Sequence, residues 1–179
     1  MMLRESVRLA REEQRVVVVV EPIALYPMRD LHGPGDGAWM GTYPDPGETI
    51  PLGEVGVHGD GRDLAIVSYG NGHYLSRQAQ KALAEGGINA RVIDMRWIAP
   101  LPADALIAAT RGCKSVLIVD ECRRTGGQAE GLMALFVERA EMPVSRLTAE
   151  DSFIATGPAY AATMPSATSI VDAARKACE

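Results

Sequence analysis

The sequence lacks long apolar runs, has few aromatic residues and carries no excess of basic charge. Its longest run of one apolar residue type is Val16–Val20, whereas a membrane-spanning helix needs about 20 apolar residues. The 18 Lys and Arg residues are outnumbered by 23 Asp and Glu residues, giving a net charge of -5. We therefore expect neither nucleic acid nor a membrane among its partners, since both attract basic surfaces.

Cysteine is also scarce. Cys113, Cys122 and Cys178 lie far apart, form no Cys-x-x-Cys pair and belong to no cluster of metal-ligating residues. This pattern is typical of free thiols in a reducing cytosol, so we expect a cytoplasmic protein. A chain of 179 residues needs no disulfide or metal for its stability, because it can bury roughly 70% of its unfolded surface.

The middle of the chain predicts a strand–helix–strand unit. Leu64–Val67 is a short apolar run, typical of a strand covered on both faces. Tyr69–Gly72 interrupts it, and Gly86–Gly87 ends the helix that follows. Ala90–Met95 is the next apolar run, and the crossover between two such parallel strands is right-handed. The apolar positions of the helix lie three or four apart, on one face: Leu75, Ala79, Ala82 and Leu83.

The flanking segments extend this unit into a sheet. Leu52–Val57 alternates in polarity, and Gly59–Gly61 predicts a hairpin-like turn that makes this strand antiparallel to the next. Beyond the central unit we expect helices at 103–110, 128–140 and 166–177 and strands at 115–120 and 142–148, with Leu132, Phe136 and Val137 facing inward. The predicted class is α/β: three layers, α/β/α, around a five-stranded mixed sheet with one antiparallel edge strand.

Residues 1–50 differ from the rest. Met2–Gln14 is helix-prone, and Val16–Val20 predicts a fully buried strand, because it has no polar alternation. Such a strand needs partners that the neighbouring sequence does not offer. Glu21–Leu52 is rich in proline and glycine, as linkers and functional loops are, although its aromatic residues indicate that parts of it pack. We therefore predict that residues 1–50 are the tail of a preceding domain plus a linker, and that residues 51–179 form the main domain.

Two glycine turns are candidates for binding an anion. Gly70–Gly72 lies between a strand and a helix, but it lacks the dinucleotide spacing and a Lys-Ser/Thr pair, which favours a plain turn. Arg123 and Arg124 precede Gly126–Gly127 at a helix start, where they could hold an anion or meet a carboxylate across an interface. In the alternative interpretation this is a solvated loop whose arginines pair with the two preceding carboxylates, Asp120 and Glu121.

No complete catalytic site emerges from the residues alone. His32, His58 and His73 are scattered over a loop, a turn and a helix start, without metal-ligand spacing and without a nucleophile motif. A solvated or capping role is favoured for each of them. The adjacent carboxylates Glu12–Glu13 and Glu150–Asp151 point to different sides, which indicates surface positions.

The order of several short motifs resembles the C-terminal domain of the transketolase family. Among its members the chain is most similar to the β-subunit portion of E1 in 2-oxo acid dehydrogenase complexes, and the likeness covers nearly the whole chain. The motifs are Glu21–Tyr26 (EPIALY), Pro51–Val55 (PLGEV), Ser68–Gly70 (SYG), Ile93–Arg96 (IDMR), Pro100–Pro102 (PLP) and Val119–Gly127 (VDECRRTGG).

The resemblance implies a part in a larger enzyme. Family members bind thiamine diphosphate with Mg²⁺ between two domains that precede this one, so we expect no catalytic, cofactor-binding or metal-binding residue here. The family's C-terminal domain forms subunit interfaces, and in E1 it docks the peripheral binding domain of the E2 acyltransferase. We therefore expect a homodimer that also meets the remaining E1 domains. Glu141 matches an acidic docking position, and Glu121, Arg123 and Arg124 are further candidates for docking or an interface.

Two features depart from the family pattern. Met28–Glu48 is longer and richer in glycine than in separate β-subunits, and is similar to E1 enzymes whose α and β parts are fused. His73 and Tyr74 replace a small apolar pair at a helix start, so the contacts there are expected to differ.

The function expected from the resemblance is that of a structural, dimerisation and E2-docking domain. The full enzyme would decarboxylate a 2-oxo acid and acylate the lipoyl group of E2, and the fragment alone would be inactive. One alternative is the same domain of a transketolase or a deoxyxylulose-phosphate synthase. Another is a stand-alone module that binds a nucleotide or coenzyme A at the two glycine turns, at the carboxyl ends of the strands.

Overall fold

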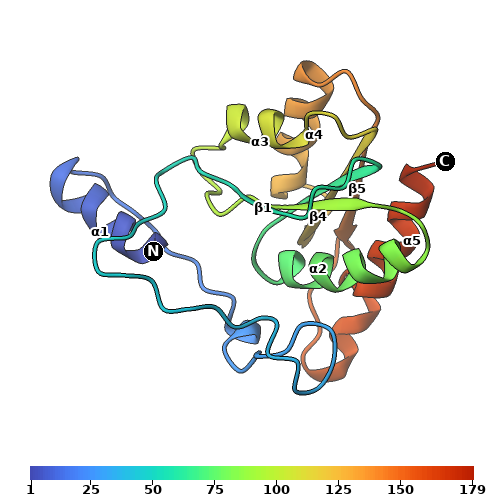
Figure 1. Ribbon diagram of the computed structural model, residues 1–179, viewed down its shortest axis with the longest axis horizontal. Coiled ribbons are helices and arrows are strands. Elements are labelled where there is room, and N and C mark those ends of the chain that lie inside the picture. The colour runs from blue at the N-terminus through green and yellow to red at the C-terminus, as the bar shows by residue number, and fades with distance from the viewer.

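The computed structural model describes residues 1–179 and contains five α-helices, five strands and two short 3₁₀ helices (Figure 1). The elements are α1 (Met2–Glu12), η1 (Ile23–Leu25), β1 (Gly56–His58), β2 (Leu64–Ser68), α2 (Gly70–Glu85), β3 (Ala90–Asp94), α3 (Ala103–Thr110), β4 (Ser115–Arg123), α4 (Gln128–Arg139), β5 (Val144–Ala149), η2 (Gly157–Ala162) and α5 (Ala167–Ala177).

The strands form one sheet in the order β1-β3-β2-β4-β5. Strand β1 pairs antiparallel with β3 at one edge, and the other three pairings are parallel. All five residues of β2 are buried, as are the first six of β4. The apolar runs thus mark strands covered on both faces, and the predicted mixed sheet with one antiparallel edge strand is confirmed.

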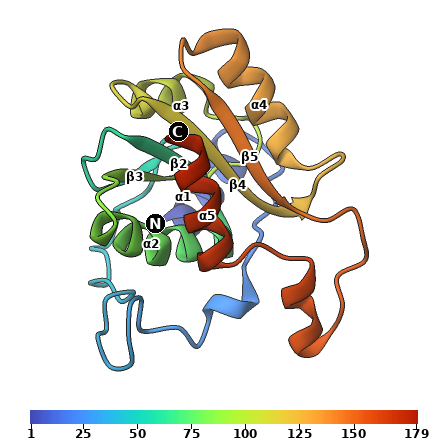
Figure 2. The same ribbon diagram turned by 90° about the vertical axis from the view of Figure 1, so that its right-hand side faces the viewer.

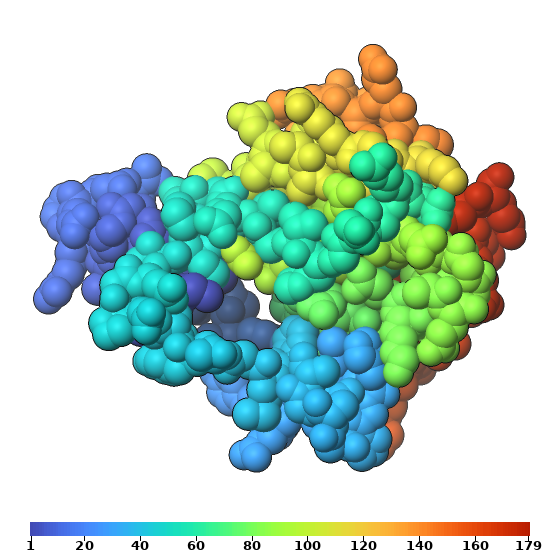
Figure 3. Space-filling view, viewed as in Figure 1, coloured from blue at the N-terminus to red at the C-terminus, as the bar shows by residue number.

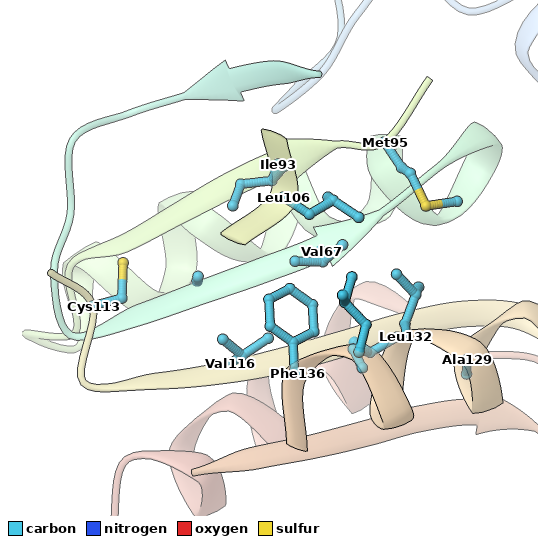
Figure 4. Close-up of a cluster of buried hydrophobic side chains, with 12 residues drawn as sticks. Val67, Ile93, Met95, Leu106, Cys113, Val116, Ala129, Leu132 and Phe136 are labelled. Carbon is cyan, nitrogen blue, oxygen red and sulfur yellow. The ribbon is translucent and has the colours of Figure 1, made fainter. Parts of the chain in front are cut away.

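Helices cover both faces of the sheet. Alternate residues of β2 enter two different cores, because successive side chains of a strand point to opposite faces. Ile66 packs with α2 and α5, while Val67 packs with α3 and α4. Figure 2 shows α3 and α4 on one side of the sheet and α2 on the other, and in Figure 4 the ring of Phe136 from α4 points toward Val67. The predicted three-layer α/β/α class is therefore confirmed.

Two helix ends follow local sequence signals. Gly86 caps the end of α2, and Gly87 follows with a φ of 83°, a conformation that glycine adopts without steric cost. Ser166 begins α5 through a capping box, because Ser166 and Ser169 each accept a hydrogen bond from the other's backbone N–H.

The inward face of two helices is narrower than predicted. Leu132 and Phe136 are buried as expected, but Val137 is 68% exposed, because it lies next to Phe136 in sequence and so turns off the buried face of α4. Ala82 of α2 is also exposed. The prediction that these two residues face inward is wrong.

The predicted hairpin between the first two strands is wrong. Strand β1 runs antiparallel to its neighbour as expected, but that neighbour is β3, with Val57 opposite Ile93. Strand β2 already has parallel partners on both edges, β3 on one side and β4 on the other, so it has no free edge for β1.

The N-terminal segment extends away from the sheet (Figure 1). Its helix, α1, forms where predicted. No strand forms at Val16–Val20 within this chain, where Val16, Val18 and Val20 are 96%, 81% and 73% exposed, so the strand is not confirmed and its burial against a preceding domain stays a prediction. A valine run becomes a strand only beside a neighbour that accepts its backbone hydrogen bonds, and this chain offers none there. None of the helices combines the length and apolar character that a membrane crossing requires.

Candidate functional site

Asp120 is a buried residue of β4 near the carboxyl ends of β2 and β4. Its side chain is only 1% exposed. One carboxylate oxygen accepts hydrogen bonds from the Tyr69 hydroxyl at 2.6 Å and from the Cys122 N–H at 2.9 Å. The other accepts from the Ala129 N–H, in the first turn of α4, at 2.8 Å. The negative charge complements the positive end of that helix, so Asp120 ties β2, β4 and α4 together.

Glu121 has the same relation to α2. Its carboxylate accepts a hydrogen bond from the Asn71 side-chain amide, in the first turn of α2, at 2.6 Å. Gly72 packs closely on the end of β2, because a Cβ there would lie 2.5 Å from the Ser68 hydroxyl. Burial raises the pKa of Glu121 above its usual range, and the hydrogen bond from Asn71 opposes that shift.

These two carboxylates decide what the glycine turns can bind. A phosphate at a helix N-terminus needs free N–H groups and a positive potential. At α4 the Ala129 N–H already binds Asp120, and at α2 the Glu121 carboxylate lies against the Asn71 side chain, so a negative charge already stands at each helix start and disfavours a second anion. The geometry therefore supports the plain-turn interpretation of Gly70–Gly72.

Arg123 and Arg124 do not pair with the preceding carboxylates, so the salt-bridged form of the solvated-loop interpretation is wrong. Both arginines are exposed, and Arg123 donates to the Thr125 carbonyl at 3.0 Å. Asp151 accepts a hydrogen bond from the Thr125 hydroxyl at 2.6 Å. This bond lowers the pKa of Asp151, and the charges of the two arginines lower it further.

The four docking candidates lie at opposite ends of the strands. Glu121, Arg123 and Arg124 are at the carboxyl end of β4, whereas Glu141 is exposed in the turn from α4 to β5, at the amino end of β5. Because β4 and β5 are parallel, the carboxyl end of β4 and the amino end of β5 lie at opposite ends of the strands. The structure brings the first three together and leaves Glu141 apart from them.

Two of the histidines come together beside an arginine. His58 ends β1, while His73 and Arg77 lie one turn apart on the same face of α2. The two imidazole rings are 4.9 Å apart between centroids. Arg77 contacts Nδ1 of His58 at 2.7 Å, and since a guanidinium can only donate, that nitrogen accepts. We call His58, His73 and Arg77 the His–Arg cluster.

The glycine-rich loop between η1 and β1 packs over this cluster. The ring of Trp39 lies 5.7 Å from that of His73 and meets the ring of Tyr74 edge-on at 4.9 Å. The Tyr74 hydroxyl donates to the Asp30 carbonyl at 2.8 Å, and the Gln78 amide donates to the Leu31 carbonyl at 2.9 Å. The loop is thus attached to α2. The prediction that its aromatic residues pack is confirmed for Trp39, whereas Tyr43 is 84% exposed and the neighbouring Met40 is 63% exposed.

The cluster faces a cleft of about 750 Å³ between the N-terminal segment and the body of the domain. Figure 3 shows this hollow between the residues in blue and cyan and those in green. Apolar residues of the N-terminal segment form one wall: Leu25, Trp39, Met40 and Ile50. The cleft is in the size range of small-molecule sites.

Burial and charge determine how the cluster titrates. The pKa of His58 and of His73 is lowered to about 4, first by burial and then by the charge of Arg77. Burial raises the pKa of Asp94, at the end of the neighbouring strand β3, against the charge of Arg96. Arg96 also forms an ion pair with Glu54 at 2.9 Å. Near neutral pH both imidazoles are therefore uncharged.

The buried His73 predicts a stability that depends on pH. Below its ordinary pKa of 6.5 the imidazole takes up a proton in the unfolded chain, but in the folded protein it does so only near 4. We therefore expect the free energy of unfolding to fall as the pH drops through this interval, with roughly 1 kcal/mol from His73 between pH 7 and pH 5.5. Urea denaturation at both pH values measures this loss. The loss of unfolding free energy between the two pH values should be smaller in His73→Phe than in the wild type. In His32→Phe, which alters an exposed histidine, it should equal that of the wild type. A loss in His73→Phe as large as in the wild type would contradict the prediction.

Sequence reasoning missed the cluster because its members are brought together by non-local pairing. His58 reaches α2 only because β1 joins the edge of β3. One local signal was present: His73 and Arg77 are four residues apart on a helix, and no Asp or Glu lies three or four residues from Arg77 to pair with it.

Comparison with known proteins agrees with this fold. A family model described as "Transketolase, C-terminal domain" matches residues 53–170. The pyruvate dehydrogenase E1 component subunit beta of Bacillus subtilis is 32% identical over 140 residues, and that of Staphylococcus aureus is 28% identical. Each alignment covers 76% of this chain and 43% of the relative, so the chain spans less than half the length of these curated relatives.

Solved structures give the same result. A structure titled "Split gene transketolase, inactive beta4 tetramer" superposes with a TM-score of 0.66 at 26% identity, over 75% of this chain and 44% of the other. A 2-oxoglutarate:ferredoxin oxidoreductase from Magnetococcus marinus, with a TM-score of 0.53 at 16% identity over 70% of this chain and 20% of that one, supports the fold alone. With the family model matching most of its length, this chain belongs to the transketolase C-terminal domain family.

Proposed function

We propose that this chain is the C-terminal structural, dimerisation and E2-docking domain of a thiamine-diphosphate-dependent 2-oxo acid dehydrogenase E1. The observation that carries the proposal is the 32% identity to a pyruvate dehydrogenase E1 β-subunit over 76% of the chain. In this proposal the complete enzyme is cytoplasmic, decarboxylates a 2-oxo acid and transfers the acyl group to a lipoyl group on E2. Residues 1–50 are then the tail of the preceding domain plus a linker.

The residues of this chain do not fit thiamine diphosphate and its Mg²⁺. The structure contains no group of three or more His, Cys, Asp or Glu side chains that could hold a metal ion. At Gly70–Gly72 the Glu121 carboxylate binds the Asn71 side chain, and its negative charge disfavours a diphosphate there. We therefore assign the cofactor to the other domains of the enzyme and expect no catalytic residue in this chain.

Exposed apolar side chains support a place in an assembly. In the segment between β5 and α5, Phe153 is 101% exposed, Ile154 58% and Tyr160 53%. The valines of Val16–Val20 are a second exposed apolar stretch. Apolar surfaces of this kind are usually covered by a partner. In our proposal the rest of E1 and a second copy of the domain cover them.

Docking to E2 is tested with the peripheral binding domain of an E2 acyltransferase. We expect calorimetry to detect a complex, and Glu141→Ala to weaken it about tenfold, because a charge-assisted contact to a basic partner is lost. The control is Glu138→Ala, which removes an exposed carboxylate three residues earlier on α4 and should leave the affinity unchanged. Light scattering of the same samples should give a dimer. A wild-type chain that binds no E2 domain contradicts the docking role, and a monomer contradicts the dimerisation role.

A second candidate is the corresponding domain of a transketolase or of a deoxyxylulose-phosphate synthase. The likeness to the split-gene transketolase structure favours it, with a TM-score of 0.66 at 26% identity. The assay that separates the two uses the enzyme reassembled from all its parts. Turnover of sugar phosphates without any acylation of lipoyl-E2 would favour this candidate.

A further inference from the structure

Asn71–Gly72 is the one Asn-Gly pair in the chain, and the other asparagine, Asn89, precedes alanine. In an Asn-Gly pair the backbone nitrogen of the glycine can attack the side-chain carbonyl carbon of the asparagine. That nitrogen loses its proton and bonds to the carbon, the side-chain nitrogen leaves as ammonia, and a succinimide ring closes. Glycine favours this step, because it has no Cβ to hinder the approach. Water then opens the ring to aspartate or isoaspartate, so that the sum consumes one water and releases one ammonia.

The start of α2 leaves the attacking nitrogen outside the helical hydrogen bonds. Gly72 lies in the first turn of the helix, whose N–H groups have no intrahelical acceptor. The N–H of the next residue, His73, donates to the Tyr69 carbonyl at 3.2 Å. Asn71 is only half-buried and lines the cleft of about 750 Å³, so water reaches the pair. Backbone hydrogen bonds of the helix therefore do not prevent the reaction.

Glu121 restrains the other reactant. Its carboxylate accepts a hydrogen bond from the Asn71 side-chain amide at 2.6 Å, which holds that side chain against the end of β4. The nitrogen that donates this bond is the one that leaves as ammonia, so the bond must break when the ring closes. Ring closure also requires the backbone of Asn71 to leave its helical conformation, because the succinimide fixes ψ outside the helical range. The native contact thus opposes the reaction.

The product does not fit the native contact. Deamidation puts a carboxylate where the Asn71 amide donated to Glu121, and two carboxylates at such a distance repel each other. We propose that Asn71 is a modification site that the fold keeps unreactive: Glu121 protects it from deamidation in the folded chain, and deamidation after the first turn of α2 has opened releases that turn from β4. The proposal does not depend on the E1 assignment.

The first test compares the folded and the unfolded chain. The 179-residue protein is kept at a mildly alkaline pH, either in buffer or in concentrated urea, and peptide mapping by mass spectrometry follows the deamidation of Asn71. We expect the rate in buffer to be at least tenfold lower than the rate in urea. In urea, Asn89 should react at least tenfold more slowly than Asn71, because the Cβ of Ala90 hinders the attack. Equal rates at Asn71 in buffer and in urea would overturn the proposal.

Variants separate the effect of Glu121 from that of the fold as a whole. Glu121→Ala removes the acceptor of the Asn71 amide, so the rate in buffer should rise at least threefold while the rate in urea stays the same. The matched control is Glu130→Ala, which removes an exposed carboxylate from the first turn of α4 and should leave both rates unchanged. Circular dichroism checks the folding of both variants. If the alanine variant does not fold, Glu121→Gln gives the same comparison, because it keeps the volume and weakens the acceptor. A folded Glu121 variant that reacts at the wild-type rate would overturn the protective role.

The aspartate product is tested directly with Asn71→Asp. We expect its midpoint of urea denaturation at pH 7 to lie below that of the wild type, because the new carboxylate faces Glu121. In the Glu121→Ala background the same substitution should lower the midpoint less, since the repelling charge is absent and the positive end of α2 favours the new carboxylate. An Asn71→Asp variant as stable as the wild type would overturn the release of α2 from β4.

Discussion

Replacing Asp120 by alanine is expected to lower the free energy of unfolding by about 4 kcal/mol, since three donors, one buried and two part-buried, lose an acceptor and each bond to a charged group contributes roughly 1.5–3 kcal/mol. The donors are the Tyr69 hydroxyl and the backbone N–H groups of Cys122 and Ala129. They come from the residue that links β2 to α2, from β4 and from α4, so one substitution loosens these elements where they meet. Urea denaturation at pH 7 measures the loss.

Two milder variants separate the hydrogen bonds from the volume of the side chain. Asp120→Asn keeps the shape and one acceptor oxygen, but it places an NH₂ group against the Ala129 N–H, so we expect an intermediate loss. Tyr69→Phe removes a single bond and should cost about 1–2 kcal/mol. A loss below about 1 kcal/mol in Asp120→Ala would contradict the role that we give to this carboxylate, because water would then have to satisfy all three donors.

Elements encoded by nearby residues were the predictable part of this fold. Leu64–Val67 is an apolar run followed by a glycine turn, Ala90–Met95 is one preceded by a glycine turn, and both form the strands that their pattern indicates. The capping box at Ser166 likewise depends on residues three apart. In each case the physical cause lies within one window of sequence, so the sequence alone suffices to find it.

Partners distant in sequence were the unpredictable part. Val16–Val20 has the same apolar pattern as β2, yet it is exposed, because a strand also needs a neighbour and composition does not say where that neighbour lies. The edge strand β1 was assigned its direction correctly and its neighbour wrongly for the same reason. Pairing is decided by the whole sheet.

The candidate site combines features that the sequence shows with contacts that only the fold reveals. His73 and Tyr74, and the long loop Met28–Glu48, were noted as separate departures from the family pattern. In the structure they are one feature, because the Trp39 ring of the loop packs against the rings of both side chains and the Tyr74 hydroxyl donates to the Asp30 carbonyl. The loop and the helix start together build the cleft. Each departure was visible in the sequence, but only the fold shows that they belong together.

Gly61→Ala is expected to destabilise the fold by about 2–3 kcal/mol, the usual cost of forcing extra atoms into a packed site. A Cβ on Gly61 would lie 2.3 Å from the Asn89 carbonyl oxygen and 2.7 Å from the Ala90 carbonyl carbon. Both are backbone atoms, so no side chain can rotate away to relieve the overlap. The two segments would have to separate, which would strain the hydrogen bond from the Asp63 N–H to the Asn89 carbonyl at 3.1 Å.

A second glycine provides a matched control in which the same substitution should change the stability in the opposite direction. Gly131 lies on the exposed face of α4 with nothing within 4 Å of a Cβ, so Gly131→Ala should raise the free energy of unfolding by roughly 0.5–1 kcal/mol through helix propensity alone. Urea denaturation of both variants at one pH gives the comparison. If Gly61→Ala cost less than about 1 kcal/mol, which is below the usual overpacking range, the close approach of the β1–β2 turn to the start of β3 would not exist in solution. The edge pairing that carries His58 to Arg77 depends on that approach, because the same turn fixes where β1 enters the sheet.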